Sequence, residues 1–179
     1  MNAFESLVAS LLKRRGFWII PSYKVALTKA EKRKIDRYSS PRWEIDLVAY
    51  KAGTNEVWAV ECKSFLDSPG VVFRDGSFEP PTRYKLFTEA KLRSVVLNRL
   101  RKQLCESGAC TSSTTVRLCL AAGHIANKTN TEAMKRHFAK KEWLLFDATW
   151  ICQELKAAAT ESYENDVAFV VAKLLLRNT

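Results

Sequence analysis

Two carboxylates and a lysine stand on two neighbouring apolar segments of the sequence. Asp46 lies within residues 43–50, and Glu61 and Lys63 end the segment 57–63. Both segments are rich in β-branched, aromatic and aliphatic residues, and a short polar stretch with a glycine separates them. This pattern predicts two strands joined as an antiparallel hairpin.

The register of this hairpin decides whether the three charged residues meet. If Lys51 and Glu56 close a four-residue loop, Asp46 falls directly opposite Glu61, with their Cβ atoms about 4.5–5.5 Å apart. Because side chains alternate along a strand, Lys63 lies on the same face as Glu61. A slip of one residue would separate the three side chains.

Two opposed carboxylates repel each other, so a cation is expected between them. Mg²⁺ or Mn²⁺ fits, since Mg²⁺ prefers oxygen ligands and commonly takes only one or two carboxylates with water and phosphate. Asp46, Glu61 and the Cys62 carbonyl are the expected ligands, and Lys63 is expected to hold the attacking water or the phosphate. The alternative is a solvent-facing salt bridge, which the strongly apolar strands disfavour.

The surrounding sequence predicts one α/β domain. Periodicity and breakers place helices at 3–15, about 86–106, 131–140, 150–159 and 163–176. Further strands are expected at 17–20, resuming near 23–25, and at 116–122 and 143–147. Residues 29–42 predict an exposed basic loop or short helix, and 66–84 a loop insertion with a small hairpin. The order predicts a mixed central sheet flanked by helices.

Ile45-Asp46-Leu47-Val48 and, fourteen residues later, Val60-Glu61-Cys62-Lys63 resemble the motif of the PD-(D/E)XK, or restriction-endonuclease-like, nuclease superfamily. Ile45 stands where that motif often has proline. The resemblance implies a Mg²⁺-dependent deoxyribonuclease, an endonuclease, with Asp46, Glu61 and Lys63 as catalytic residues. It implies a single domain over 1–179, with a core at about 3–122, the insertion at 66–84, and a C-terminal strand and helices at 123–179.

The resemblance also singles out residues on two predicted helices. Family members often carry a glutamate on the first helix, which points to Glu5 as a catalytic residue. Asn2 and Glu5 equally have the spacing of a capping box, and both interpretations stay open. The helix after the motif strand commonly contributes polar residues, which points to Gln103 and Arg99. For Gln103, an ordinary solvated helix position is the favoured alternative.

The net charge is +10, from 29 Lys and Arg against 19 Asp and Glu, and such an excess attracts polyanions. Basic runs occur within 29–37, 93–102 and 135–141. A single run is ordinarily a solvated face, but beside a metal site the runs predict a groove that follows a DNA backbone. The candidates for DNA contact are Lys32, Arg33, Lys34, Arg99, Arg101, Lys102 and Gln103.

Other classes of protein are disfavoured. No apolar stretch reaches the roughly 20 residues that span a bilayer, and the N-terminus lacks the pattern of a signal peptide, so no membrane partner and a cytoplasmic location are expected. Five cysteines without a C-x-x-C pair indicate neither a disulfide framework nor a structural zinc site. The expected partners are DNA and either a second copy or a targeting protein. The alternative function is a catalytically silent DNA-binding or assembly module of the same fold.

Overall fold

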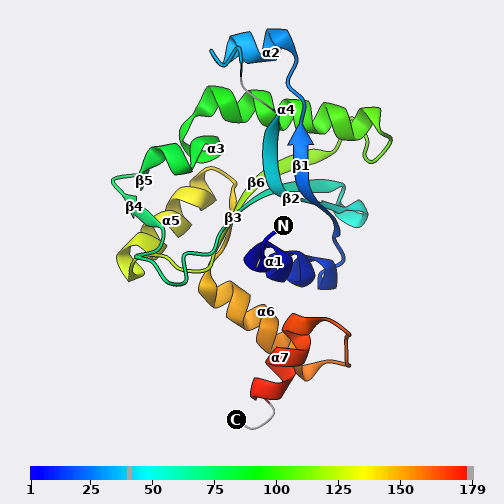
Figure 1. Cartoon of the computed structure of the whole chain (residues 1–179), viewed down its shortest axis with the longest axis vertical. Helices are drawn as coiled ribbons and strands as arrows, with labels where there is room; N and C mark the ends of the chain where they lie inside the picture. The colour runs from blue at the N-terminus through cyan, green and yellow to red at the C-terminus, as the bar shows by residue number, and fades with distance from the viewer. Residues whose placement is uncertain (40–41, 177–179) are drawn as a thin grey trace.

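The computed structural model describes residues 1–39 and 42–176 (Figure 1). Its centre is a five-stranded mixed sheet in the order β1-β2-β3-β6-β7. The first three strands pair antiparallel, whereas β3, β6 and β7 are parallel. The strands are β1 (Trp18–Val25), β2 (Trp43–Lys51), β3 (Glu56–Lys63), β6 (Thr115–Ala122) and β7 (Leu144–Phe146).

Helices cover both faces of this sheet, as the sequence predicts. Figure 1 shows α1 on one side and α4 on the other, and the buried side chains form a separate core on each side. α3, α4 and α5 pack over the first core, while α1, α6 and α7 pack over the second. The helices are α1 (Ala3–Arg14), α2 (Lys29–Lys34), α3 (Lys85–Thr88), α4 (Ala90–Glu106), α5 (Lys128–Lys140), α6 (Ala148–Thr160) and α7 (Val167–Leu176).

The hairpin has the predicted register. Lys51 pairs with Glu56 and Leu47 pairs with Val60, so the residues of the two strands are paired as predicted. A 3₁₀ turn at Ala52–Thr54 closes the loop, followed by Asn55 in the left-handed region at φ 50°. Asparagine tolerates this conformation better than other non-glycine residues do. The predicted hairpin of β2 and β3 is therefore confirmed.

The insertion also matches its prediction. Strands β4 (Val72–Arg74) and β5 (Ser77–Glu79) form a small antiparallel hairpin, followed by a 3₁₀ turn at Pro81–Arg83. In the basic segment at 29–42, α2 is the short helix that was expected, and residues 40–41 lie outside the described residues.

The single helix predicted at 86–106 is wrong in one respect, because two helices occupy this range. Glu89 between α3 and α4 is extended, at φ −101° and ψ 95°. Its carboxylate accepts hydrogen bonds from Arg37 Nη2 at 2.7 and 2.8 Å, while Thr88 Oγ1 turns back to the Tyr84 carbonyl. These side-chain contacts lie at the break between α3 and α4.

Three of the later helix boundaries differ from the prediction, two of them because of N-caps. α5 begins at Lys128 because the side chain of Asn127 accepts from Asn130 N, and α6 begins at Ala148 because Asp147 accepts from Trp150 N. α7 begins at Val167, after the predicted start at 163. Within residues 1–39 and 42–176, no helix has both the length and the apolar character needed to cross a membrane.

Candidate active site

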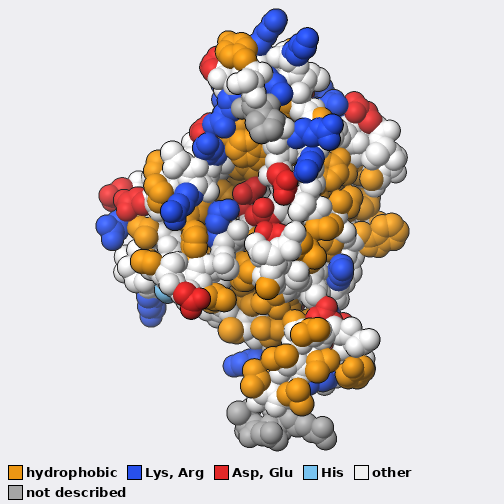
Figure 2. Space-filling model, viewed as in Figure 1, with side chains coloured by type: hydrophobic (Ala, Val, Ile, Leu, Met, Phe, Trp, Pro, Cys, Tyr) orange, Lys and Arg blue, Asp and Glu red, His pale blue; other side chains and the backbone are white. Residues whose placement is uncertain are grey.

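The predicted cluster lies where β2 leaves β3, beside the N-terminal end of α1. Figure 2 shows acidic side chains gathered in the middle of one face, over these elements, with Lys and Arg side chains above them over α2 and α4. The site is thus at the carboxyl end of β3, which is parallel to β6. Ligands of α/β sheets commonly bind outside the carboxyl ends of parallel strands.

Asp46 occupies an interruption of the sheet. The ladder between β2 and β3 ends at the Leu47–Val60 pair, and the Asp46 carboxylate takes over by accepting from Cys62 N at 2.7 Å. On the other side of β2, the ladder to β1 skips Ser22, which stands opposite Asp46. Ser22 has a positive φ of 49°. The Asp46 side chain thus replaces a backbone partner, and the hydrogen bond occupies one of its oxygens, Oδ2.

Glu61 is the buried member of the cluster. Its side chain is 17% exposed, Oε2 lies 3.8 Å from Lys63 Nζ, and Oε1 is buried without a hydrogen-bond donor. Burial first, and the neighbouring Asp46 second, raise the pKa of Glu61 to about 7. A buried carboxylate oxygen without a partner is costly, so this site fits a cation.

The position of Lys63 depends on a close approach of two chain segments. Gly123 N donates to the Lys63 carbonyl at 2.9 Å, directly after β6. A Cβ on Gly123 would lie 2.5 Å from the Ser64 carbonyl oxygen, which real Cβ atoms do not tolerate. Glycine at 123 therefore lets the end of β3 lie against β6. The motif does not include Gly123, although a glycine next to a strand can mark a close backbone approach.

Glu5 has two roles at once. The capping box is present, since Glu5 N donates to Asn2 Oδ1 and Glu5 Oε2 accepts from Asn2 N at 3.0 Å. The charge of Glu5 also raises the pKa of Asp46 and of Glu61. Because its oxygens already accept from Asn2, Glu5 contributes negative charge to the site from the helix end.

The backbone of Cys62 is part of the site, whereas its thiol is buried in the core. The thiol is buried on the α1 side of the sheet, and this burial strongly raises its pKa, so it stays protonated. Only the carbonyl of Cys62 is suited to bind a hard cation.

A metal ion at this site would depend on few protein ligands. Across the described residues, no three His, Cys, Asp or Glu side chains gather closely enough to hold an ion. Asp46 and Glu61 together supply two carboxylates, which is the number that Mg²⁺ commonly takes from a protein. Water and substrate oxygens would complete its coordination.

The residues expected to contact DNA divide into two groups. Lys32, Arg33 and Lys34 lie on α2, and Arg101 and Lys102 are exposed on α4. Arg99 and Gln103 instead bind the chain that follows β1, the former through Ala26 O at 3.0 Å and the latter through Ala26 N at 2.7 Å. The prediction that Gln103 is an ordinary solvated residue is wrong, because its amide oxygen is used by the backbone.

Comparison of this chain with protein-family models, with curated proteins and with solved structures gives no significant match.

Proposed function

We propose that this protein is a metal-dependent nuclease of the PD-(D/E)XK type that hydrolyses phosphodiester bonds in DNA. The observation that carries the proposal is the buried, unpartnered Oε1 of Glu61. Glu61 and Asp46 both lie one residue beyond the last pair of the β2–β3 ladder, Leu47 and Val60, and Lys63 Nζ lies 3.8 Å from the other oxygen of Glu61. A cation between the two carboxylates satisfies Oε1.

Each residue of the cluster has a distinct part in this proposal. Asp46, Glu61 and the Cys62 carbonyl hold Mg²⁺ or Mn²⁺. When bound, the ion activates water and offsets the negative charge that grows on the phosphoryl group. The hydrogen bond from Cys62 N fixes the orientation of Asp46. Lys63 donates to the attacking water or to a phosphate oxygen, as a compact cation suited to that charge.

Glu5 supports the same chemistry from a distance. Its carboxylate adds negative potential beside Asp46 and Glu61, which favours a bound cation over an empty site. A fixed negative charge close to the ion also strengthens the preference of the site for a divalent cation over a monovalent one.

DNA is the proposed substrate because of the motif resemblance and the distribution of charge. Basic side chains over α2 and α4 border the acidic cluster on one face of the molecule (Figure 2). A phosphate backbone that contacts them would pass across the carboxylates. Endonuclease action, a cytoplasmic location, and a second copy or a targeting protein as partner belong to the same proposal.

The test is cleavage of plasmid, linear and branched DNA with Mg²⁺ or Mn²⁺. We expect metal-dependent cutting by the wild type and a loss of at least about 100-fold in Asp46→Asn and in Lys63→Ala, since each removes a group that acts on the charged transition state. Lys156→Ala, an exposed lysine on α6, is the matched control and should cut normally.

Binding without cutting would give the opposite result. If the folded wild type binds these substrates but cuts none with either metal, the protein is a DNA-binding module and the nuclease proposal is wrong.

A further inference from the structure

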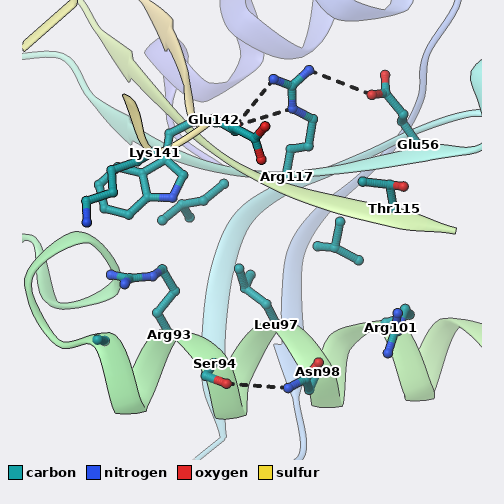
Figure 3. A pocket seen from close by; sticks show the side chains of 14 residues that line it. Glu56, Arg93, Ser94, Leu97, Asn98, Arg101, Thr115, Arg117, Lys141 and Glu142 are labelled. Atoms are coloured by element: carbon teal, nitrogen blue, oxygen red, sulfur yellow. Dashed lines mark hydrogen bonds and ion pairs between the residues drawn. The ribbon is translucent and has the colours of Figure 1, made fainter. Parts of the chain in front are cut away.

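A polar cavity lies at the other end of the central strands from the carboxylate site. It has a volume of about 680 Å³ and is bordered by α4, by the first half of β6 and by the loop that precedes β7 (Figure 3). Glu56 and Thr115 at its wall begin β3 and β6, whereas Glu61 lies five residues further along β3. At 3.3 Å per residue, Glu56 and Glu61 are about 16 Å apart along β3. The cavity is therefore separate from the carboxylate site.

The cavity exists because β7 is short. β7 pairs only with residues 119–121 of β6, so the edge of β6 before Cys119 has no strand beside it. α4 runs below that edge, and the loop at 141–143 lies above it. The space is thus framed by three elements that pack against the same core.

The walls of the cavity carry more positive than negative charge. Arg93, Arg101, Arg117 and Lys141 line it, against the carboxylates of Glu56 and Glu142. Arg117 is neutralised, since it lies 3.7 Å from Glu56 and also donates to the Glu142 carbonyl at 3.3 Å. Among residues 1–39 and 42–176, no carboxylate lies within ion-pair distance of the other three cations.

Arg93 is held rigidly in place. Its Nη1 donates to the carbonyls of Leu86 and Phe87 at 3.1 and 3.2 Å, and its guanidinium lies 4.8 Å from the centre of the Trp143 ring. These contacts leave Nε and Nη2 as donors. Burial lowers the pKa of Arg93, so the cation is partly removed from water without a counter-anion. A fixed, partly desolvated guanidinium is suited to two parallel hydrogen bonds with an anion.

The other groups extend this site along α4. Figure 3 shows Arg93 and Arg101 at opposite ends of the helical wall, with Leu97 and the hydrogen-bonded pair Ser94 and Asn98 between them. Figure 3 also shows Lys141 on the same side of the cavity as Arg93. Arg93 and Arg101 are eight residues apart, or about 12 Å along the helix.

We propose that this cavity binds the phosphate group of a nucleotide, either free or within a nucleic-acid strand. Arg93 and Lys141 hold the phosphate at one end. The apolar side chains of Leu97, Val116 and Leu118 contact the sugar and base, with Ser94 and Asn98 as hydrogen-bonding groups. The volume lies within the range of small-ligand sites. Arg101, about 12 Å along α4 from Arg93, is placed to contact a second phosphate of a strand, which a nucleoside monophosphate lacks.

The test is a titration of the full chain in EDTA, so that no divalent metal takes part. The probes are inorganic phosphate, adenosine 5′-monophosphate, adenosine, and a single-stranded DNA of eight nucleotides. We expect the phosphate-bearing probes to bind and adenosine to fail. Lys141→Gln should lower the affinity for the phosphate-bearing probes about tenfold, which corresponds to the loss of roughly one charge-assisted hydrogen bond. Lys140→Gln, the adjacent exposed lysine outside the cavity, should change affinity less than about twofold.

Arg101→Gln identifies the source of the phosphate. A loss of DNA affinity in both Arg101→Gln and Lys141→Gln, with monophosphate affinity kept in Arg101→Gln, assigns the cavity to a strand. Unchanged DNA affinity in both variants, with Lys141→Gln still weakened for the monophosphate, assigns it to a free nucleotide. Adenosine binding as tightly as its monophosphate, or equal losses in Lys141→Gln and Lys140→Gln, would overturn the proposal. Asp46→Asn should retain full binding here, so this result is independent of the nuclease test.

Discussion

The Glu61 side chain is placed at an energetic disadvantage that a bound cation removes. Its Oε1 is buried without a donor, and Lys63 Nζ is 3.8 Å from Oε2, beyond hydrogen-bond distance. A carboxylate in this position destabilises the metal-free fold whenever it is ionised. The cost is thus tied to the ionisation of one residue, and it should be visible in the pH dependence of stability.

For the metal-free protein, we expect Glu61→Gln to raise the free energy of unfolding at pH 8 and to leave it almost unchanged at pH 4. The pKa of Glu61 rises from 4.5 to about 7 on folding, so the native state binds more protons than the unfolded state between these values. The contribution of Glu61 to stability is therefore favourable at low pH and is lost as pH rises through this window. The difference is at most about 3–4 kcal/mol.

Urea denaturation of wild type and Glu61→Gln in EDTA, from pH 4 to pH 8, measures this effect. Parallel stability curves for the two proteins would show that Glu61 is not the buried, ionisation-sensitive group described above.

The electrostatic effect of Glu5 on the site can be separated from its role in capping α1. Glu5→Gln keeps a residue type that completes a capping box, so metal-free stability should change by less than about 0.5 kcal/mol. The charge beside Asp46 and Glu61 is lost, however, and the stabilisation by Mg²⁺ or Mn²⁺ should require severalfold more metal. Glu31→Gln is the matched control, because Glu31 completes the capping box of α2 with Thr28.

Thermal unfolding over a series of metal concentrations compares the two variants. Equal responses of Glu5→Gln and Glu31→Gln to metal would restrict Glu5 to helix capping.

At the scale of elements, the junction of β3 and β6 positions Lys63. Gly123→Ala introduces a Cβ 2.5 Å from the Ser64 carbonyl oxygen, so one of the two segments must move. We expect a loss of about 1–3 kcal/mol in stability and a fall in DNA cleavage, since overpacking is relieved by backbone shifts. Gly53→Ala, in the turn between β2 and β3 with no atom within 4 Å of the new Cβ, should leave both unchanged. The check is a denaturation curve and a cleavage rate for each variant.

The sequence predicts these elements well wherever the signal is local. Alternation and loop length predict the register of the hairpin, and the observed pairs from Lys51–Glu56 to Leu47–Val60 agree, although the ladder ends one residue before Asp46 and Glu61. The caps Asn127 and Asp147 are local signals too, and they locate the helix starts that periodicity alone placed too late.

Distant contacts account for what the sequence does not predict. Glu89, at the break, binds Arg37, which is 52 residues away in the chain, and Gln103 binds Ala26, 77 residues away. The hydrogen bond from Cys62 N to Asp46 arises only because the ladder between β2 and β3 ends at this point. Residue types and spacing predict the members of the site, whereas its hydrogen bonding depends on backbone geometry.

At the scale of the whole molecule, the chain carries a net charge of +10. On the face that carries the site, acidic and basic side chains occupy different regions (Figure 2). Acidic side chains occupy the middle of this face, and basic side chains over α2 and α4 lie beside them (Figure 2). Arg33 and Lys34 are exposed at the end of α2, on the side of the molecule opposite α6 and α7 in Figure 1. A DNA duplex that places a phosphate at the carboxylates would lie along α2 and release counterions there.

The salt dependence of DNA binding tests this path. With Ca²⁺ in place of Mg²⁺ to limit cleavage, we expect Arg33→Gln/Lys34→Gln to lower the slope of log K against log salt by about 0.9 for each phosphate contact removed, or nearly 2 in total. Lys13→Gln/Lys156→Gln changes the net charge equally with two exposed lysines on α1 and α6, and it should leave the slope unchanged. Equal slopes for the two double variants would mean that DNA is attracted by net charge alone and that α2 does not border its path.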